Sequence, residues 1–221
     1  MGLVLLVRHG QASFGAEDYD VLSETGVEQS RMLGRALADQ GLAPTAVVHG
    51  AMQRQRDTAT AIVDGGGWSA SPILDDGWDE FDHVGVIARY VEASGVGEPS
   101  DRREVQQVFE NATARWTGGK HDDEYEEIWS AFVARVVAAL DRACAQDGIT
   151  VVSSSGGPIA AAFAGLVDPS ATPAGLPRLW RVFNTVIVNA SVTRVLQGST
   201  GRRLLTFNEH GHLPRELVTY R

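Results

Sequence analysis

The run Leu3-Val4-Leu5-Leu6-Val7, which leads directly into Arg8-His9-Gly10, points to the architecture of the chain. Five apolar residues in succession are typical of a short strand that is buried on both faces in a parallel sheet. In open α/β sheets, ligands bind beyond the carboxyl ends of the strands. Arg8 and His9 follow such an end, so a cation and an imidazole stand where a ligand is expected.

The segments that follow alternate between helical and strand patterns. Apolar residues at helical spacing predict helices, short apolar runs predict strands, and a glycine cluster at 65–67 ends the second helix. The expected elements are a helix at about 25–40, a strand at 46–49, a helix at about 53–63 and a short strand near 72–74. This order predicts a mostly parallel sheet.

The stretch from Val84 to Gly119 interrupts the alternation with a helical pattern of its own, so we interpret it as a helical insertion that covers a site. A long helix is then expected at about 123–145, where acidic residues suit its positive end. Gly156-Gly157-Pro158 opens a helix that runs to about Val167. The remaining expected elements are a strand at 149–153, a loop at 168–177 and strands near 185–188, 192–197 and 204–207.

Composition limits the classes of partner. A chain of 221 residues with 43% hydrophobic residues suits one domain over residues 1–221. The net charge of −9 argues against nucleic acid and anionic membrane as main partners, since both require a basic surface. No apolar run has the length of a membrane span and no secretory signal is recognised, so we expect a cytoplasmic protein. The oligomeric state is open, and a homodimer is among the states that the sequence allows.

The single cysteine, Cys144, excludes an internal disulfide and falls on the apolar face of the long helix, so we expect it in the core. The core is also the expected place of four large aromatic residues, although a pocket or an interface is the alternative. These residues are Trp78, Phe81, Trp116 and Trp180.

Further polar residues follow other expected strands and converge on the same edge as His9. Arg54 comes shortly after the second strand, and Ser155 with Gly156 follows a later one. Arginine offers fixed donors for bidentate contact with a phosphoryl group, and neutral imidazole is a nucleophile near pH 7. Two arginines around one histidine therefore predict a phosphoryl-transfer site, against the plainer interpretation of any single Arg-His pair as a surface ion pair or a satisfied core histidine.

Over most of its length the chain resembles the histidine phosphatase superfamily, also called phosphoglycerate mutase-like. The similar segments include an opening motif, a first-helix signature, a second arginine motif, an acidic segment and a late strand with its turn. They are Arg8-His9-Gly10-Gln11, Leu22-Ser23-Glu24-Thr25-Gly26 with Gln29, Gly50-Ala51-Met52-Gln53-Arg54 with Thr58-Ala59, Trp78-Asp79-Glu80-Phe81 and Val151-Val152-Ser153-Ser154-Ser155-Gly156-Gly157.

The resemblance implies a three-layer α/β/α sandwich and a phosphohistidine on His9. It further implies that Arg8 and Arg54 hold the phosphoryl oxygens and that Glu80 protonates the leaving oxygen. The residue types alone support His9, Arg8 and Arg54 but leave the acid open. Glu80 shares its segment with four other carboxylates, which are Asp75, Asp76, Asp79 and Asp82.

Two positions depart from the family pattern. Gly50 stands where a serine is usual, and Ser155 stands where a second histidine is usual. A hydroxyl donates one hydrogen bond but brings no positive charge, and losing such a contact can cost roughly 3–4 kcal/mol of transition-state stabilisation. Amides at the start of the following helix, or a swing of His83 or His210, are the candidate compensations.

We expect no cofactor and no metal, since His210 and His212 lack further recognisable ligands. Signatures of a cysteine-dependent phosphatase, a nucleotide-binding loop and a serine hydrolase are absent from the sequence. Three functions remain: hydrolysis of a small phosphorylated substrate, mutase-type phosphotransfer, and phospho-ligand binding with weak catalysis because of Ser155. We favour hydrolysis, because the 84–119 insertion is short and a mutase must hold its substrate for re-attack.

Overall fold

The computed structural model describes residues 2–13, 20–172 and 175–220. In these ranges a six-stranded sheet has the order β3-β2-β4-β1-β5-β6. Its strands are β1 (Gly2–Arg8), β2 (Ala46–His49), β3 (Ile73–Leu74), β4 (Gly148–Ser154), β5 (Val192–Gly198) and β6 (Gly201–Glu209). The first four are parallel, whereas β5 runs antiparallel to β1 and β6 antiparallel to β5. The prediction of a mostly parallel sheet is confirmed.

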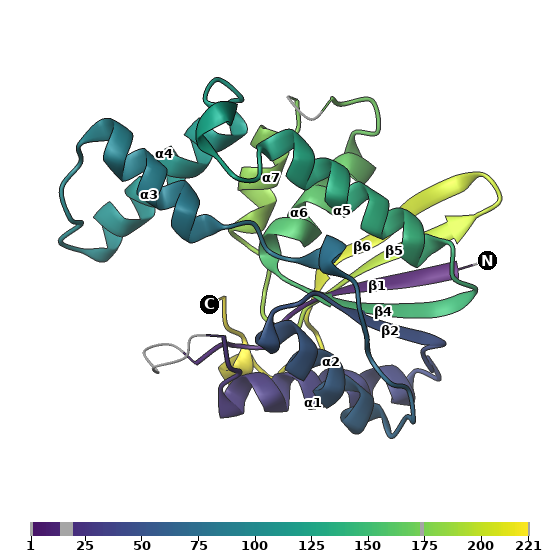
Figure 1. The fold of residues 1–221 in the computed structure, drawn as a ribbon. Helices are drawn as coiled ribbons and strands as arrows, with labels where there is room; N and C mark the ends of the chain where they lie inside the picture. The colour runs from purple at the N-terminus through teal and green to yellow at the C-terminus, as the bar shows by residue number, and fades with distance from the viewer. Residues whose placement is uncertain (1, 14–19, 173–174, 221) are drawn as a thin grey trace.

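Helices cover both faces of this sheet (Figure 1). They are α1 (Glu24–Asp39), α2 (Gln53–Gly66), α3 (His83–Ser94), α4 (Arg102–Thr117), α5 (Trp129–Cys144), α6 (Gly156–Val167) and α7 (Pro177–Asn184). The pair α1 and α2 lies below the sheet in this view, and α5 and α6 lie above it. The fold is therefore the expected three-layer α/β/α sandwich.

Alternate side chains of β1 enter different cores. Leu5 packs on one face in the cluster that contains Leu33 of α1 and Ile62 of α2. Leu6 packs on the other face with Phe132 of α5. Because both faces are covered, every position of the central run can be apolar. Each such side chain, when fully buried, stabilises the fold by roughly 1.5–3 kcal/mol.

The register of β1 against β4 fixes which residues meet at one edge of the sheet. The two strands are parallel, and Arg8 lies opposite Ser154. The backbone amide of His9 donates to the carbonyl oxygen of Ser154 at 2.8 Å. The carboxyl ends of β1, β2 and β4 thus lie at one edge of the sheet, on the left in Figure 1.

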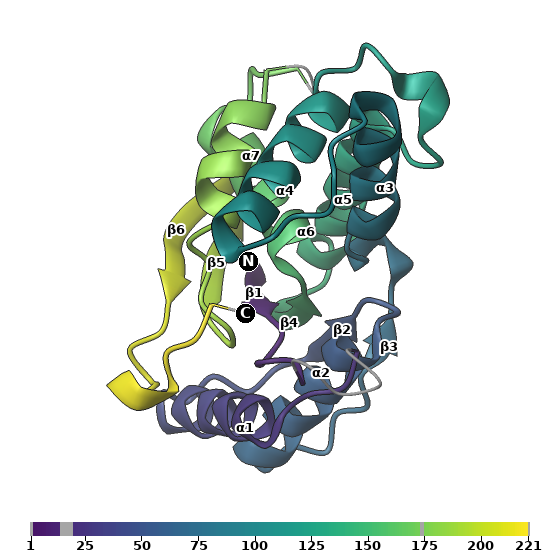
Figure 2. The same cartoon turned by 90° about the vertical axis from the view of Figure 1, so that its left-hand side faces the viewer.

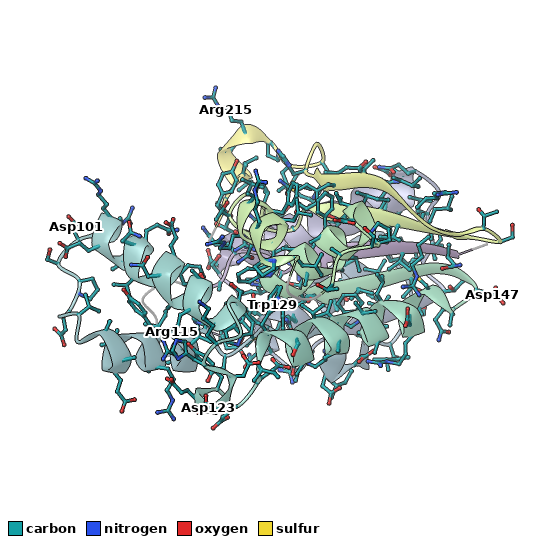
Figure 3. The ribbon with its side chains drawn as sticks, turned by 90° about the horizontal axis from the view of Figure 1, so that it is seen from above. Asp101, Arg115, Asp123, Trp129, Asp147 and Arg215 are labelled. Carbon is teal, nitrogen blue, oxygen red and sulfur yellow. The ribbon has the colours of Figure 1, made fainter. Side chains whose placement is uncertain are left out.

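Helices α3 and α4 form an arm beside this edge (Figure 2). In the view from above, Asp101 marks the outer end of the arm and Asp147 the opposite end of the molecule (Figure 3). Aromatic packing joins the arm to the sandwich, since the ring of Trp116 stacks on Phe81 with centroids 4.8 Å apart and meets Trp129 edge-on at 5.3 Å. The four aromatic residues expected in the core are all buried, as is Cys144.

The start of α5 differs from the expectation. The helix begins at Trp129 and not near residue 123, because Asp122–Glu124 form a separate 3-10 turn. Glu124 there forms an ion pair with Arg115 of α4 at 2.7 Å. Glu124 therefore binds the arm, and none of these acidic residues lies in the first turn of the helix.

The segment after α6 also differs. Residues 177–184 form α7, which the sequence reasoning did not predict, and the strand expected near 185–188 is wrong. Pro177 opens the helix, and the indole nitrogen of Trp180 donates to Gly157 O at 2.9 Å. The expected loop at 168–177 includes residues 173–174, which lie outside the described residues. Within the described residues, no helix is both long and apolar enough to cross a membrane.

Candidate functional site

His9 lies at the end of β1 with only 5% of its surface exposed. Its Nδ1 is 2.7 Å from the carbonyl oxygen of Gly10, and because a carbonyl only accepts, Nδ1 carries the proton and Nε2 the lone pair. Burial holds the pKa of His9 well below its usual value, and the charges of Arg8 and Arg54 lower it further. The imidazole is therefore neutral, with Nε2 available as a nucleophile.

Arg54 faces the nucleophilic nitrogen from the first turn of α2. Its Nε donates to His9 Nε2 at 3.2 Å, and its Nη1 forms an ion pair with Asp20 at 2.7 Å. Asp20 also accepts from the amide of Gln53 at 2.8 Å, so the carboxylate ties the guanidinium to the start of the helix. The guanidinium is buried and fixed in direction before any ligand arrives.

The segment that precedes β5 holds Arg8 and the backbone of His9. Arg8 Nη1 donates to the carbonyl oxygen of Ile187. Asn189 Nδ2 donates to His9 O at 3.0 Å, and the amide of Ala190 donates to Arg8 O at 3.0 Å. Ala190 adopts a left-handed φ of 56°, a conformation that costs free energy in a non-glycine residue and here accompanies the turn against the end of β1.

Glu80 lies against the start of α6. Its Oε2 accepts from the amide of Gly157 at 3.1 Å and its Oε1 from the amide of Phe81 at 3.1 Å. A Cβ on Gly157 would lie 2.0 Å from Oε1, so a larger residue there would displace this carboxyl group. Burial raises the pKa of Glu80 above its usual value, although the two amide bonds and the charges of His83 and Arg54 oppose the rise.

The four other carboxylates of this segment are engaged elsewhere or exposed. Asp75 forms an ion pair with Arg142 at 2.6 Å, and Asp76 is exposed. Asp79 accepts from the amide of Ala51 at 2.5 Å, while Asp82 accepts from the amide of Gly85 at the start of α3. Glu80 alone of the five has a described hydrogen bond to the start of α6.

Ser155 connects β4 to α6 and is buried, with 1% exposed. Its Oγ accepts from Gln55 Nε2 at 2.8 Å. The neighbouring Gly156 lies against the side chain of Asn184 at the end of α7, whose Oδ1 would be 2.7 Å from a Cβ on Gly156. All six predicted residues thus lie at one edge through direct contacts or adjacent positions: Arg8, His9, Arg54, Glu80, Ser155 and Gly156.

The two histidines considered as compensation each have a described contact. The ring of His83, the first residue of α3, lies edge-on to Phe81 with centroids 6.3 Å apart. His210 Nδ1 lies 2.6 Å from the carbonyl oxygen of Asn208. Across the described ranges, no group of three or more histidine, cysteine, aspartate or glutamate side chains is arranged to hold a metal ion.

Sequence reasoning did not single out Asp20, Gln55 or Asn189. Asp20 is remote in sequence from the arginine that it holds, and Asn189 acts on His9 from 180 residues away. Gln55 directly follows Arg54 inside a helix, where a glutamine ordinarily faces solvent. The one available signal was a polar residue on the buried side of α2, next to a predicted site residue.

Solved structures share this fold. A phosphoglycerate mutase from Bacillus anthracis str. Sterne is 20% identical with a TM-score of 0.65, and the match covers 95% of this chain and 94% of that one. A phosphoserine phosphatase from Entamoeba histolytica is 17% identical with a TM-score of 0.66, and the match covers 97% of this chain and 100% of that one. A mycobacterial glucosyl-3-phosphoglycerate phosphatase is 21% identical with a TM-score of 0.61, and the match covers 93% of this chain and 98% of that one. At these identities the likeness concerns the fold alone.

No curated protein sequence matches the chain at a significant level. The model of the histidine phosphatase superfamily (branch 1) matches residues 4–210, which include both arginine motifs, the acidic segment and the turn before α6. This match covers nearly the whole chain. The chain belongs to branch 1 of the histidine phosphatase superfamily.

Proposed function

We propose that this chain is a phosphatase that hydrolyses a small phosphomonoester through a phosphohistidine on His9. The proposal rests on the state of the imidazole. Its Nδ1 is held by Gly10 O at 2.7 Å, while Nε2 is unprotonated and faces Arg54 Nε at 3.2 Å. A nucleophilic lone pair beside a guanidinium that can bind phosphoryl oxygens suits phosphoryl transfer.

In the first step, His9 Nε2 attacks phosphorus and the ester P–O bond breaks. Arg54 turns its donors from Nε2 to the phosphoryl oxygens, and Arg8 binds them as well. The Nδ1 proton stays on the ring, where Gly10 O stabilises the positive charge that develops. Glu80 gives its proton to the leaving oxygen, so that the alcohol departs neutral.

In the second step, the Glu80 carboxylate takes a proton from water as the water oxygen attacks phosphorus. The P–N bond breaks, inorganic phosphate forms and the imidazole returns to its neutral state. The raised pKa of Glu80 suits both directions, because it keeps a protonated acid available for the first step and gives a stronger base for the second.

Ser155 favours a second candidate, a protein that binds phosphorylated ligands with little turnover. A hydroxyl offers a phosphoryl group no positive charge, and here it is hydrogen-bonded to the neutral amide of Gln55. Mutase-type phosphotransfer differs from hydrolysis only in the acceptor, and it would give isomerised phosphomonoester in excess of free phosphate.

The test is hydrolysis of p-nitrophenyl phosphate from pH 4 to 8 with EDTA present, comparing the native chain with His9→Gln. We expect turnover in the native chain and none in the variant, together with an acid-labile phosphoprotein on rapid quenching of the native chain alone. A native chain without turnover that still binds inorganic phosphate would favour the binding function, and equal turnover in both chains would remove His9 from the mechanism.

His49→Gln is the matched control. His49 ends β2 as His9 follows β1, is buried, and places its Nδ1 2.7 Å from the carbonyl oxygen of the next residue, Gly50. The two substitutions therefore disturb similar surroundings, but we expect His49→Gln to keep its turnover.

A further inference from the structure

Gln55 is a buried polar side chain for which the proposed mechanism has no use. It lies in the first turn of α2, directly after Arg54, and none of its surface is exposed. A buried amide must satisfy its donors and acceptor within the protein, because an unpaired one costs about 1–3 kcal/mol. The partners of Gln55 therefore show what holds it in place.

These partners fix the direction of each hydrogen bond. Gln55 Nε2 lies 3.3 Å from the carbonyl oxygen of Trp78, which only accepts, and Oε1 lies 3.3 Å from the amide of Met52, which only donates. The two ends of the amide are therefore not interchangeable. Nε2 has no lone pair, so Ser155 Oγ, 2.8 Å away, must accept from it. The proton of Ser155 remains available for another acceptor.

Ser155 also forgoes the hydrogen bond that its position favours. It is the residue before α6, where a serine side chain ordinarily accepts from an amide of the first turn. All of α6 lies in the described part of the chain, and Ser155 makes no such bond to it. The amide of Gly157 donates to Glu80 instead. The next capping position is Pro158, which has no amide proton, so neither amide that a serine cap uses competes with Gln55 for the hydroxyl.

Gly50 makes this arrangement possible. A Cβ at position 50 would lie 2.1 Å from Gln55 Oε1 and 2.7 Å from Asp79 Oδ1. The Oε1 end of the Gln55 amide therefore occupies space beside position 50 that a Cβ would crowd, while its Nε2 end contacts Ser155. The two departures from the family pattern, Gly50 and Ser155, meet at one glutamine side chain.

We propose that Gln55 is a positioning residue that holds the Ser155 hydroxyl as a fixed donor to the phosphoryl group. The inference rests on the proposed function and deepens it. The amide of Gln55 occupies a lone pair of the hydroxyl, so the proton points away from Gln55, and Ser155 itself lies just after the end of β4, at the edge where β1 ends. Ser155 then provides one preorganised neutral hydrogen bond in place of a cation.

A double-mutant cycle tests the inference. Gln55→Met keeps the length of the side chain but removes its donors, and Ser155→Ala removes the hydroxyl. We expect Gln55→Met to lower kcat/KM for p-nitrophenyl phosphate by about fivefold to tenfold in the native background, the value of one neutral hydrogen bond. In the Ser155→Ala background we expect less than about a twofold effect, because the hydroxyl that Gln55 orients is gone. Equal losses in both backgrounds would assign Gln55 a purely structural role and overturn the inference.

Gln29→Met is the matched control, since Gln29 is equally buried and donates to Leu217 O at 2.7 Å and not to Ser155. Its effect should be the same in both Ser155 backgrounds, and melting temperatures identify variants that fail to fold.

The four proteins of the Gln55 and Ser155 cycle are also titrated with inorganic phosphate by calorimetry, where the coupling between the two substitutions should reappear in Kd. If the Gln55 and Ser155 substitutions are coupled in phosphate binding but no protein shows turnover, the proposed function is overturned and this inference stands. If turnover depends on His9 but the two substitutions are not coupled, this inference is overturned and the proposed function stands. A native chain that neither binds phosphate nor turns over would overturn both.

Discussion

His9 and Glu80 have environments that shift their pKa values in opposite directions. Burial lowers the pKa of His9 from 6.5 and raises that of Glu80 from 4.5. A nucleophile must be unprotonated, so the rate falls only when the pH drops through the lowered pKa of His9. A general acid must be protonated, so the rate falls when the pH rises through the raised pKa of Glu80. We therefore expect highest activity in mildly acidic solution.

Glu80→Gln separates these two limbs of the pH profile. With an alkyl phosphomonoester, whose leaving oxygen needs a proton, we expect kcat to fall by roughly a hundredfold or more. The alkaline limb, which is the fall in rate as the pH rises through the pKa of Glu80, should disappear. With p-nitrophenyl phosphate the fall should be smaller, because that leaving group is more acidic. Steady-state rates from pH 4 to 8 give both results.

Asp79→Asn is the control for this prediction, since Asp79 is adjacent but accepts from the amide of Ala51. It should retain the alkaline limb even where it lowers stability. An alkaline limb that persists in Glu80→Gln and vanishes in Asp79→Asn would transfer the acid role to Asp79.

The central residues of the site were predictable because they follow strands. His9 and Arg54 each come shortly after a short apolar run, and parallel strands bring such ends together. Glu80 lies on an irregular segment between β3 and α3, so the residue types alone left five acids open. Gln55 and Asp20 act through contacts between distant segments, which local patterns do not reveal.

At the scale of elements, α4 and α7 lie side by side above the edge that carries the site (Figure 2). A cavity of about 300 Å³ between them is lined by residues of both helices, among them Phe109, Arg181 and Asn184. Asn184 also touches Gly156, so the cavity adjoins the site. We expect this cavity to receive the alcohol part of the substrate.

Reversing one charge at this cavity tests that expectation. Arg181→Glu should raise KM by about tenfold for a phosphomonoester whose alcohol carries a carboxylate. The native arginine attracts that carboxylate, whereas a glutamate at position 181 repels it. Its KM for p-nitrophenyl phosphate should change by less than about twofold, and added salt should weaken the effect because Arg181 is exposed. Arg203→Glu, on an exposed position of β6, serves as the control. Equal KM changes in the two variants would show that the carboxylate is bound elsewhere.

The element that sequence patterns missed is α7, and the reason is local ambiguity. Thr185-Val186-Ile187-Val188 is rich in β-branched residues and so favours a strand. In the structure it lies after the helix, and the amide of Val188 donates to the side chain of Asn208. Tertiary contacts therefore overrode strand propensity. By contrast, β2, β4 and α6 were predicted nearly to the residue, because apolar runs or glycine and proline signals mark their ends.

At the scale of the whole molecule, stability should depend on a histidine outside the site. Burial lowers the pKa of His212 from 6.5 to about 4, and its Nε2 is buried. Between these pH values the unfolded chain binds a proton that the folded chain does not, so the fold loses stability as the pH falls. The burial of His9 acts in the same direction.

His212→Gln keeps a polar side chain but removes this titration. From pH 7 to pH 5 the native chain should lose about 2 kcal/mol more of its free energy of unfolding than the variant, as measured by urea denaturation at each pH. His121→Gln is the control, because that side chain is 44% exposed and folding changes its surroundings less. Parallel pH dependence in the native chain and His212→Gln would mean that the folded protein admits the proton at this histidine.

The close approach of Gly50 to Gln55 also limits how the site can evolve. A side chain at position 50 would require Gln55 Oε1 to move, so its effect depends on the residue at position 55. We therefore expect Gly50→Ser to lower stability less in a Gln55→Ala background than in the native chain. Variants that restore the family pattern should therefore change positions 50 and 55 together, because residues in contact do not act additively.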